Sequence, residues 1–246
     1  MATELPLIVI NVQRGGPSTG LPTKTEQSDL LQAMYGRNGE APVPIVAPQS
    51  PSDCFYAAFE AARIALTYRT PVMLLSDGFL ANSSEPWLLP DPADLPSIDV
   101  EFLREPNHPD GFLPLLRDPD TLARPWAVPG TPGLQHRIGG LEKHEVTGNI
   151  SYEASNHQRQ TELRHARVEK VGASLPPLDV DDPTGDADVL VLGWGSTYGP
   201  IRGAVRQARD EGARVARAHL RHLAPLPHDL GDVLARYCLL YTSDAA

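Results

Sequence analysis

The sequence of 246 residues is long enough for one large α/β domain or two smaller ones, and its 41% hydrophobic content is that of a chain that can bury a core. A formal net charge of −10 without a basic run excludes proteins that hold nucleic acid through Lys and Arg contacts to phosphates. Two cysteines cannot supply the four thiolates of an iron–sulfur cluster. No apolar segment approaches the roughly 18–20 residues of a membrane span, and the start does not resemble a signal peptide. We therefore expect a cytoplasmic protein.

The first third of the chain alternates predicted strands and helices. Apolar runs, rich in β-branched residues at the start, predict strands at residues 7–12, 43–47 and 71–76, covered on both faces of a sheet. Thr23 and Glu26 fit a capping box for a helix that ends near Tyr35. Ser50 and Pro51 fit the start of a second helix, in which Phe55 begins a series of apolar residues at helical spacing. This order predicts a parallel sheet with right-handed crossovers.

The remaining chain divides into a proline-rich segment and a second α/β unit. Residues 86–135 contain eleven prolines together with Trp87 and Trp126, which predicts an extended but ordered surface excursion. A polar helix is expected at 152–170, followed by a Pro-, Asp- and Gly-rich boundary. The second unit is predicted as a strand, a glycine turn, a helix and a strand. We therefore expect three parts, which are residues 1–85, 86–186 and 187–246.

The loop between the first strand and the first helix is the main candidate for a ligand site. It lies at the carboxyl end of a predicted parallel strand, where open α/β folds bind ligands. Arg14 offers a planar fork for a carboxylate or phosphate, Thr23 offers a hydroxyl, and a helix start would add partial positive charge. The supporting residues are Gly15, Gly16, Ser18, Thr19 and Gly20. The alternative is a structural turn in which Thr23 only caps the helix.

A glycine-rich turn and a group of histidines give weaker indications of function than this loop. The run Gly193-x-Gly195-x-x-x-Gly199 follows a predicted strand, but its spacing differs from that of dinucleotide-binding loops and no ribose-binding acid follows. His136, His144, His157 and His165 match no metal-ligand spacing, so no metal site is predicted.

Four long sequence blocks resemble one family. They are NVQRGGPSTGLPTKTEQSDL at 11–30, MYGRNG at 34–39, ARPWAVPG at 123–130 and RIGGLE at 137–142, the last followed by TGN at 147–149 and His157. They closely resemble the alpha subunit of 2-oxoacid:ferredoxin oxidoreductases, particularly the 2-oxoglutarate type. The resemblance covers residues 1 to about 237.

The resemblance implies a fold and an activity. The fold would be part of a pyrimidine-type thiamine-diphosphate-binding domain plus an incomplete domain like the transketolase C-terminal one. The family oxidatively decarboxylates a 2-oxoacid to an acyl-CoA and passes electrons to ferredoxin. The thiamine diphosphate is shared with a beta subunit, an iron–sulfur cluster lies in a partner, and a gamma subunit or domain is a further candidate partner. Arg14 and Thr23 would contact the substrate carboxylate.

Two departures from the family pattern are expected to matter. The upstream thiamine motif and its Glu are absent, and residues 238–246 are atypical, so we expect a fragment that is inactive alone, binds thiamine diphosphate weakly or not at all, and is disordered from Thr242 onward. Three alternatives stay open: a non-catalytic assembly subunit, an oxidoreductase for pyruvate or branched-chain 2-oxoacids, and a nicotinamide-dependent enzyme. The retained Arg14 and Thr23 disfavour the first, and the missing fingerprint disfavours the last.

Overall fold

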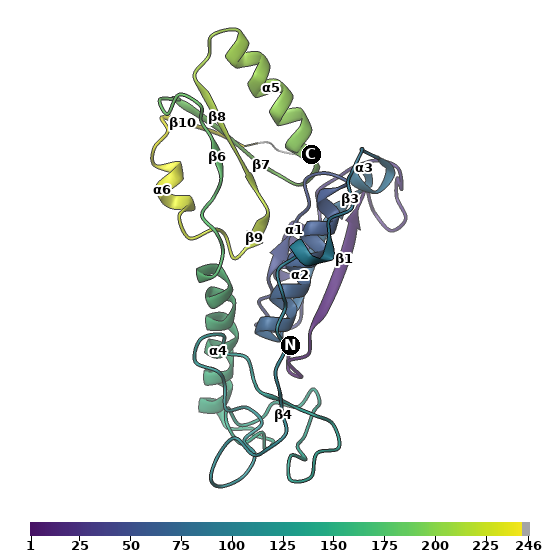
Figure 1. Ribbon diagram of the computed structural model, residues 1–246, viewed down its shortest axis with the longest axis vertical. Helices are drawn as coiled ribbons and strands as arrows, with labels where there is room; N and C mark the ends of the chain where they lie inside the picture. Colours follow the sequence, from purple (N-terminus) through teal and green to yellow (C-terminus); the bar gives the residue numbers. More distant parts are fainter. Residues whose placement is uncertain (243–246) are drawn as a thin grey trace.

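The computed structural model describes residues 1–242, which form two α/β units and an irregular segment held by one long helix. Figure 1 shows the second unit at one end of the molecule and the irregular segment at the other, with the first unit beside them. The predicted α/β fold with parallel sheets is confirmed. Among the described residues, no helix combines the length and the apolar character that a membrane crossing requires.

The first sheet has four strands in the order β1-β3-β2-β9. Its strands are β1 (Leu7–Gln13), β2 (Ile45–Val46), β3 (Pro71–Asp77) and β9 (His222–Ala224). β1 and β2 both run parallel to β3, as the alternation of strands and helices predicts. β9 is antiparallel to β2 and comes from the C-terminal part of the sequence, so a strand of the predicted second unit completes the first sheet.

The helices of the first unit begin later than predicted. They are α1 (Leu30–Tyr35), α2 (Asp53–Tyr68) and α3 (Gly78–Asn82). The expected start of the first helix at Thr23 is wrong, because residues 21–29 form a bridge, turns and irregular backbone, and α1 begins at Leu30. In α2 the buried face combines the small residues Ala57 and Ala61 with Ile64, whereas Phe55 is 36% exposed. Small side chains let this helix pack closely on the sheet, and the larger Phe55 stacks against Trp87 outside the core.

Strand β1 forms one edge of its sheet, and the expectation that it is covered on both faces is wrong. Leu7 is 56% exposed and Ile10 is 61% exposed, although both are apolar. The strand pairs on one side only, with β3, in the register Leu7↔Pro71 to Gln13↔Asp77. A run of β-branched residues therefore indicated a strand correctly but did not indicate its position in the sheet.

The proline-rich segment is mostly irregular but anchored. It contains a short 3-10 helix η1 (Pro92–Asp94) and two paired two-residue strands, β4 (Phe102–Leu103) and β5 (Trp126–Ala127). α4 (Ala154–Ala173) runs alongside it (Figure 1). Glu4 joins the proline-rich segment to α4. Its carboxylate accepts two 2.7 Å hydrogen bonds from Arg117 of the segment and lies 2.8 Å from Arg167 of α4. All three side chains are at most 7% exposed, so this ion cluster is buried.

The second sheet has the order β10-β7-β8-β6. Its elements are β6 (Val180–Asp181), β7 (Val189–Trp194), η2 (Gly195–Thr197), α5 (Tyr198–Asp210), β8 (Val215–Leu220), α6 (Leu230–Leu234) and β10 (Leu239–Thr242). β6 belongs to this sheet although the sequence placed it in the connecting segment. The division into three parts otherwise stays a prediction. Thr242, expected to be disordered, pairs with Leu192, whereas the rest of the predicted disordered tail lies outside the described residues.

One hydrophobic core extends across both units. Ile45 and Leu75 of the first sheet share a cluster with Leu190 and Ala216 of the second, and Ala33 of α1 lies in the same cluster. Burial of this apolar surface, at about 25 cal/mol per Å², holds the two sheets against each other. The shared core sets the position of the loops that leave the carboxyl ends of β1, β3 and β7.

Candidate functional site

The candidate loop begins where β1 ends, at a buried glutamine. Gln13 is 1% exposed, donates to the carbonyl of Ser76 in the neighbouring β3 and accepts from the backbone N–H of Asp29, each at 3.1 Å. The Asp29 carboxylate in turn accepts from the Asn11 amide at 2.9 Å. These bonds join the start and the end of the loop, so residues 14–28 project from a fixed base.

Within the loop, the backbone folds back on itself. Gly15 pairs with Leu21 in an isolated bridge, and the N–H of Gly15 donates to the carbonyl of Lys24 at 3.1 Å. The loop ends therefore run side by side, with Arg14 near one end and Thr23 near the other. Gly20 makes the fold-back possible: its φ is +50°, and a Cβ there would lie 1.9 Å from the carbonyl oxygen of Gly15. No other residue type fits that approach.

The guanidinium of Arg14 is held by one edge only. Its Nε donates to the carbonyl of Thr19 at 3.0 Å, and the residue is exposed. Among residues 1–242, neither of its Nη atoms is used in a hydrogen bond, so both remain able to donate to an anion in the forked geometry that suits a carboxylate. Thr23 is also exposed, and its hydroxyl is free among the described residues. The structure thus brings the two predicted contact residues onto one solvent-facing loop.

Glu26 has a different role from the one predicted. It does not cap a helix at Thr23. Instead its carboxylate accepts from the N–H of Gly16 at 3.3 Å. With Gly15, Leu21 and Lys24 donating within the loop, four backbone N–H groups are already occupied. The loop also offers no helix N-terminus, because α1 begins only at Leu30. It fits a carboxylate that approaches the side chain of Arg14.

A contact between the two units lies near the end of the loop and was not predicted. The side-chain amide of Gln27 donates to the carbonyl of Trp194 at 3.3 Å. The next residue, Gly195, has φ +61°, and a Cβ there would lie 2.2 Å from Nε2 of Gln27. Glycine at position 195 is thus required for close contact with Gln27. The glycine turn was noted in the sequence, but only as a weak candidate for nucleotide binding.

The turn at Gly195 is also fixed from the second sheet. His219 of β8 contacts the carbonyl of Gly195 through Nε2 at 2.9 Å, so Nε2 carries the proton, since a carbonyl can only accept. Burial, reinforced by the nearby Arg217 and Arg221, outweighs this bond and lowers the pKa of His219 to about 4. The ring is therefore neutral at pH 7. Its Nδ1 is buried and has no hydrogen-bond partner among the described residues.

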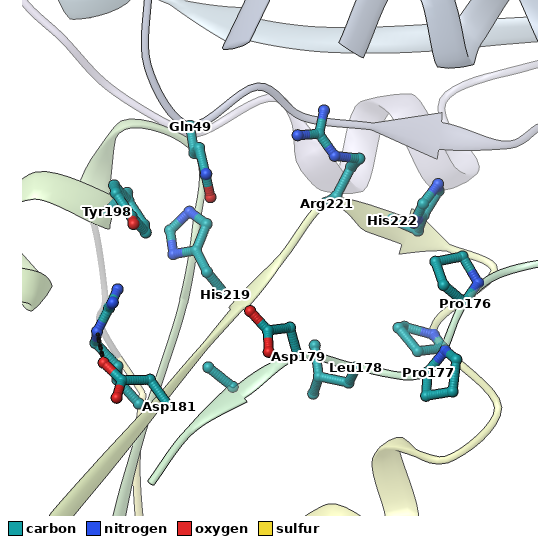
Figure 2. A pocket seen from close by; sticks show the side chains of 13 residues that line it. Gln49, Pro176, Pro177, Leu178, Asp179, Asp181, Tyr198, His219, Arg221 and His222 are labelled. Atoms are coloured by element: carbon teal, nitrogen blue, oxygen red, sulfur yellow. Dashed lines mark hydrogen bonds and ion pairs between the residues drawn. The ribbon is translucent and has the colours of Figure 1, made fainter. Parts of the chain in front are cut away.

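His219 lines a hollow of about 270 Å³ between the two units. Figure 2 shows Gln49, Tyr198 and His219 towards one end of the hollow and Arg221 and His222 towards the other. The Tyr198 and His219 rings meet edge to face at 5.2 Å. Arg221 is paired with Asp53 of α2, so this hollow offers no free arginine at that end.

Comparisons with known proteins agree with this architecture. The family described as pyruvate flavodoxin/ferredoxin oxidoreductase, thiamine diP-binding, matches residues 1–156. The Mycobacterium tuberculosis protein named 2-oxoglutarate oxidoreductase subunit KorA is 61% identical over 96% of this chain and 35% of its own length. The Methanothermobacter marburgensis 2-oxoglutarate synthase subunit KorA is 32% identical over 92% of this chain and 58% of its own length.

A solved structure shows the same fold over nearly the whole chain. It is that of a 2-oxoglutarate:ferredoxin oxidoreductase from Magnetococcus marinus with 2-oxoglutarate, coenzyme A and succinyl-CoA bound. It superposes with a TM-score of 0.89 at 33% identity, over 98% of this chain and 41% of that one. The chain thus spans between about a third and three fifths of the length of these relatives. Because the family match covers more than half of its residues, the chain belongs to the pyruvate flavodoxin/ferredoxin oxidoreductase family, in its thiamine-diphosphate-binding part.

Proposed function

We propose that this chain is the part of an oxidoreductase alpha subunit that binds the substrate carboxylate in the oxidative decarboxylation of 2-oxoglutarate. In the reaction, the 2-oxoacid loses a carboxyl group as CO₂, the acyl group forms a thioester with coenzyme A, and two electrons pass to ferredoxin. The names of the similar Mycobacterium and Methanothermobacter subunits support the substrate, and the ligands of the Magnetococcus structure support both substrate and product.

The observation that carries the proposal is the free edge of the Arg14 guanidinium. Its Nε is fixed on Thr19, its Nη atoms face solvent, and Thr23 lies on the adjoining part of the same loop. An arginine held in this way loses little further conformational freedom when it grips a carboxylate with both Nη atoms. The hydrogen bonds of Gln13 and Gln27 anchor the loop and so fix the position of Arg14.

The proposal assigns the remaining chemistry to partners. With two cysteines, the chain cannot bind a four-thiolate cluster, so the electrons must leave through a beta subunit that carries it. Because no helix N-terminus lies at the loop, we assign the diphosphate of thiamine diphosphate to the beta subunit. A gamma subunit or domain and cytoplasmic localisation belong to the same proposal.

The test is steady-state kinetics of the assembled oxidoreductase with the variant Arg14→Ala. Loss of a charge-assisted bond, about 1.5–3 kcal/mol, should lower kcat/KM for 2-oxoglutarate at least about tenfold. Arg14→Lys should recover only part, because an ammonium keeps the charge but not the fork. The matched control is Arg236→Ala, which removes an exposed arginine that follows α6, far from the loop in the sequence. Unchanged efficiency in Arg14→Ala, or a preference for pyruvate over 2-oxoglutarate, would contradict the proposal.

A further inference from the structure

The loop that carries Arg14 also carries a second exposed cation, Lys24. The two residues lie on facing limbs of the fold-back, because the N–H of Gly15, the residue after Arg14, donates to the carbonyl of Lys24 at 3.1 Å. The N–H of Lys24 in turn donates to the carbonyl of Leu21 at 2.9 Å. The backbone of Lys24 is therefore fixed by two hydrogen bonds, while its side chain extends into solvent.

Lys24 lies at the edge of the sheet where a ligand is expected. A Cβ built on Gly78, the residue that follows β3, would lie 3.6 Å from the carbonyl oxygen of Lys24 and 3.7 Å from that of Gln13, the last residue of β1. Lys24 is thus next to the carboxyl ends of two parallel strands, where open α/β sheets bind their ligands. Arg14 follows β1 at the same edge.

The carboxylates of the loop do not neutralise these two cations. Glu26 accepts from the backbone N–H of Gly16 at 3.3 Å, and Asp29 accepts from a side-chain amide of β1 at 2.9 Å. Among residues 1–242, neither Arg14 nor Lys24 forms an ion pair with a carboxylate. Two positive charges on one loop repel each other when no counter-charge is present, and a bound anion relieves that repulsion.

The two cations leave the loop at different places. Nε of Arg14 donates to the carbonyl of Thr19, which directs the guanidinium towards the tip of the fold-back, residues 16–20. Lys24 lies on the return limb, beyond the bridge between Gly15 and Leu21 that closes the tip. A carboxylate that both Nη atoms of Arg14 bind leaves the ammonium of Lys24 available for a second carboxylate. The arrangement therefore suits a ligand with a carboxylate at each end of its carbon chain.

We propose that Lys24 determines substrate specificity by binding the distal carboxylate of a dicarboxylic 2-oxoacid, while Arg14 binds the carboxylate next to the keto group. This inference rests on the proposed function, since it takes the Arg14 loop as the substrate site. It assigns the preference for 2-oxoglutarate over 2-oxoacids that end in a methyl group to one ammonium group of this chain. A point charge on a flexible stem suits the task, because the distal carboxylate needs charge rather than a fixed fork.

The test compares two substrates of the assembled oxidoreductase, 2-oxoglutarate and 2-oxobutyrate, which differ only in the distal carboxylate. In Lys24→Ala, kcat/KM for 2-oxoglutarate should fall at least about tenfold, because a charge-assisted bond is lost, whereas kcat/KM for 2-oxobutyrate should stay the same. Lys24→Arg keeps the charge and should recover most of the efficiency with 2-oxoglutarate. The control Lys170→Ala removes the same charge from the last turn of α4 and should change neither substrate.

Three results would overturn the inference: unchanged efficiency with 2-oxoglutarate in Lys24→Ala, an equal loss with both substrates, or no recovery in Lys24→Arg. A failure of the proposed function appears elsewhere. Because Arg14 binds the carboxylate that both substrates share, Arg14→Ala should lower the efficiency with both, and no loss with either would contradict the Arg14 site. The ratio between the two substrates in Lys24→Ala tests Lys24 alone, so the two failures are distinguishable.

Discussion

The side-chain amide of Gln27 donates a hydrogen bond to the carbonyl oxygen of Trp194 across 3.3 Å, although 167 residues separate them in the sequence. Gln27 lies near the end of the candidate loop, and Trp194 precedes the turn that leads into α5. This bond therefore connects the loop that carries Arg14 to the start of α5. The position of the loop depends on how the two units are held together at this point.

Gly195→Ala should destabilise the protein by about 1–3 kcal/mol, since alanine is strained at φ +61° and its Cβ would meet the amide of Gln27. Urea unfolding measures the change. Gly231→Ala in α6, where a Cβ meets nothing within 4 Å, is the control and should be neutral or slightly stabilising. The double variant Gln27→Ala/Gly195→Ala should recover the part of the loss that is due to the clash. No recovery would show that strain alone accounts for it.

Glu4→Gln should cost about 3–5 kcal/mol, because it leaves Arg117 and Arg167 buried without their counter-charge. Chemical denaturation at neutral pH tests this against Glu101→Gln, which changes an exposed carboxylate. A loss no larger than that of the control would show that the cluster adds nothing to stability.

The same carboxylate predicts a pH dependence. Burial raises the pKa of Glu4, but the guanidiniums of Arg167 and Arg117 outweigh burial and hold the pKa below its ordinary value of 4.5. A depressed pKa means that the stabilisation is present above the ordinary value and is lost as the pH falls through the lower, folded value. Unfolding free energies measured from pH 6 downward should therefore fall less steeply in Glu4→Gln than in the unmodified protein.

The imidazole of His219 should stay neutral down to about pH 4. Its folded pKa lies below the ordinary 6.5, so the neutral ring contributes stability above pH 6.5, and this contribution is lost as the pH falls from there towards 4. NMR titration of the ring protons tests this, and His219→Gln identifies the resonance by its absence. A midpoint near 6.5 would contradict the burial of this ring beneath the Gly195 turn.

The chain by itself should neither bind thiamine diphosphate with micromolar affinity nor turn over any 2-oxoacid. The loop ends without a helix N-terminus that could bind the diphosphate, and the only thiols are the half-buried Cys54 and the exposed Cys238. Calorimetry with thiamine diphosphate and Mg²⁺ checks the first part, and an assay for dye reduction with 2-oxoglutarate checks the second. Micromolar binding would mean that residues outside the loop complete a cofactor site within this chain.

The sequence by itself determined the main strands of the first third of the chain and their parallel direction. The apolar runs at 7–12 and 71–76 became β1 and β3, and the alternation with helices required their parallel pairing. Glycines and Arg14 after the first strand indicated a loop that faces a ligand, because that position lies at the carboxyl end of a parallel strand. These are local features, or they follow from chain order alone.

Only the tertiary structure decided where the first helix begins and which distant residues contact each other. A capping pattern at Thr23 and Glu26 favours a helix locally. In the folded chain, however, Glu26 is hydrogen-bonded to Gly16, Gln27 to Trp194 and Asp29 to Gln13. These contacts keep the segment non-helical as far as Leu30. Likewise, β9 enters the first sheet from the far end of the chain. Partners distant in sequence leave no local pattern, so the contact between the two units and the hollow beside it could be found only once the chain was folded.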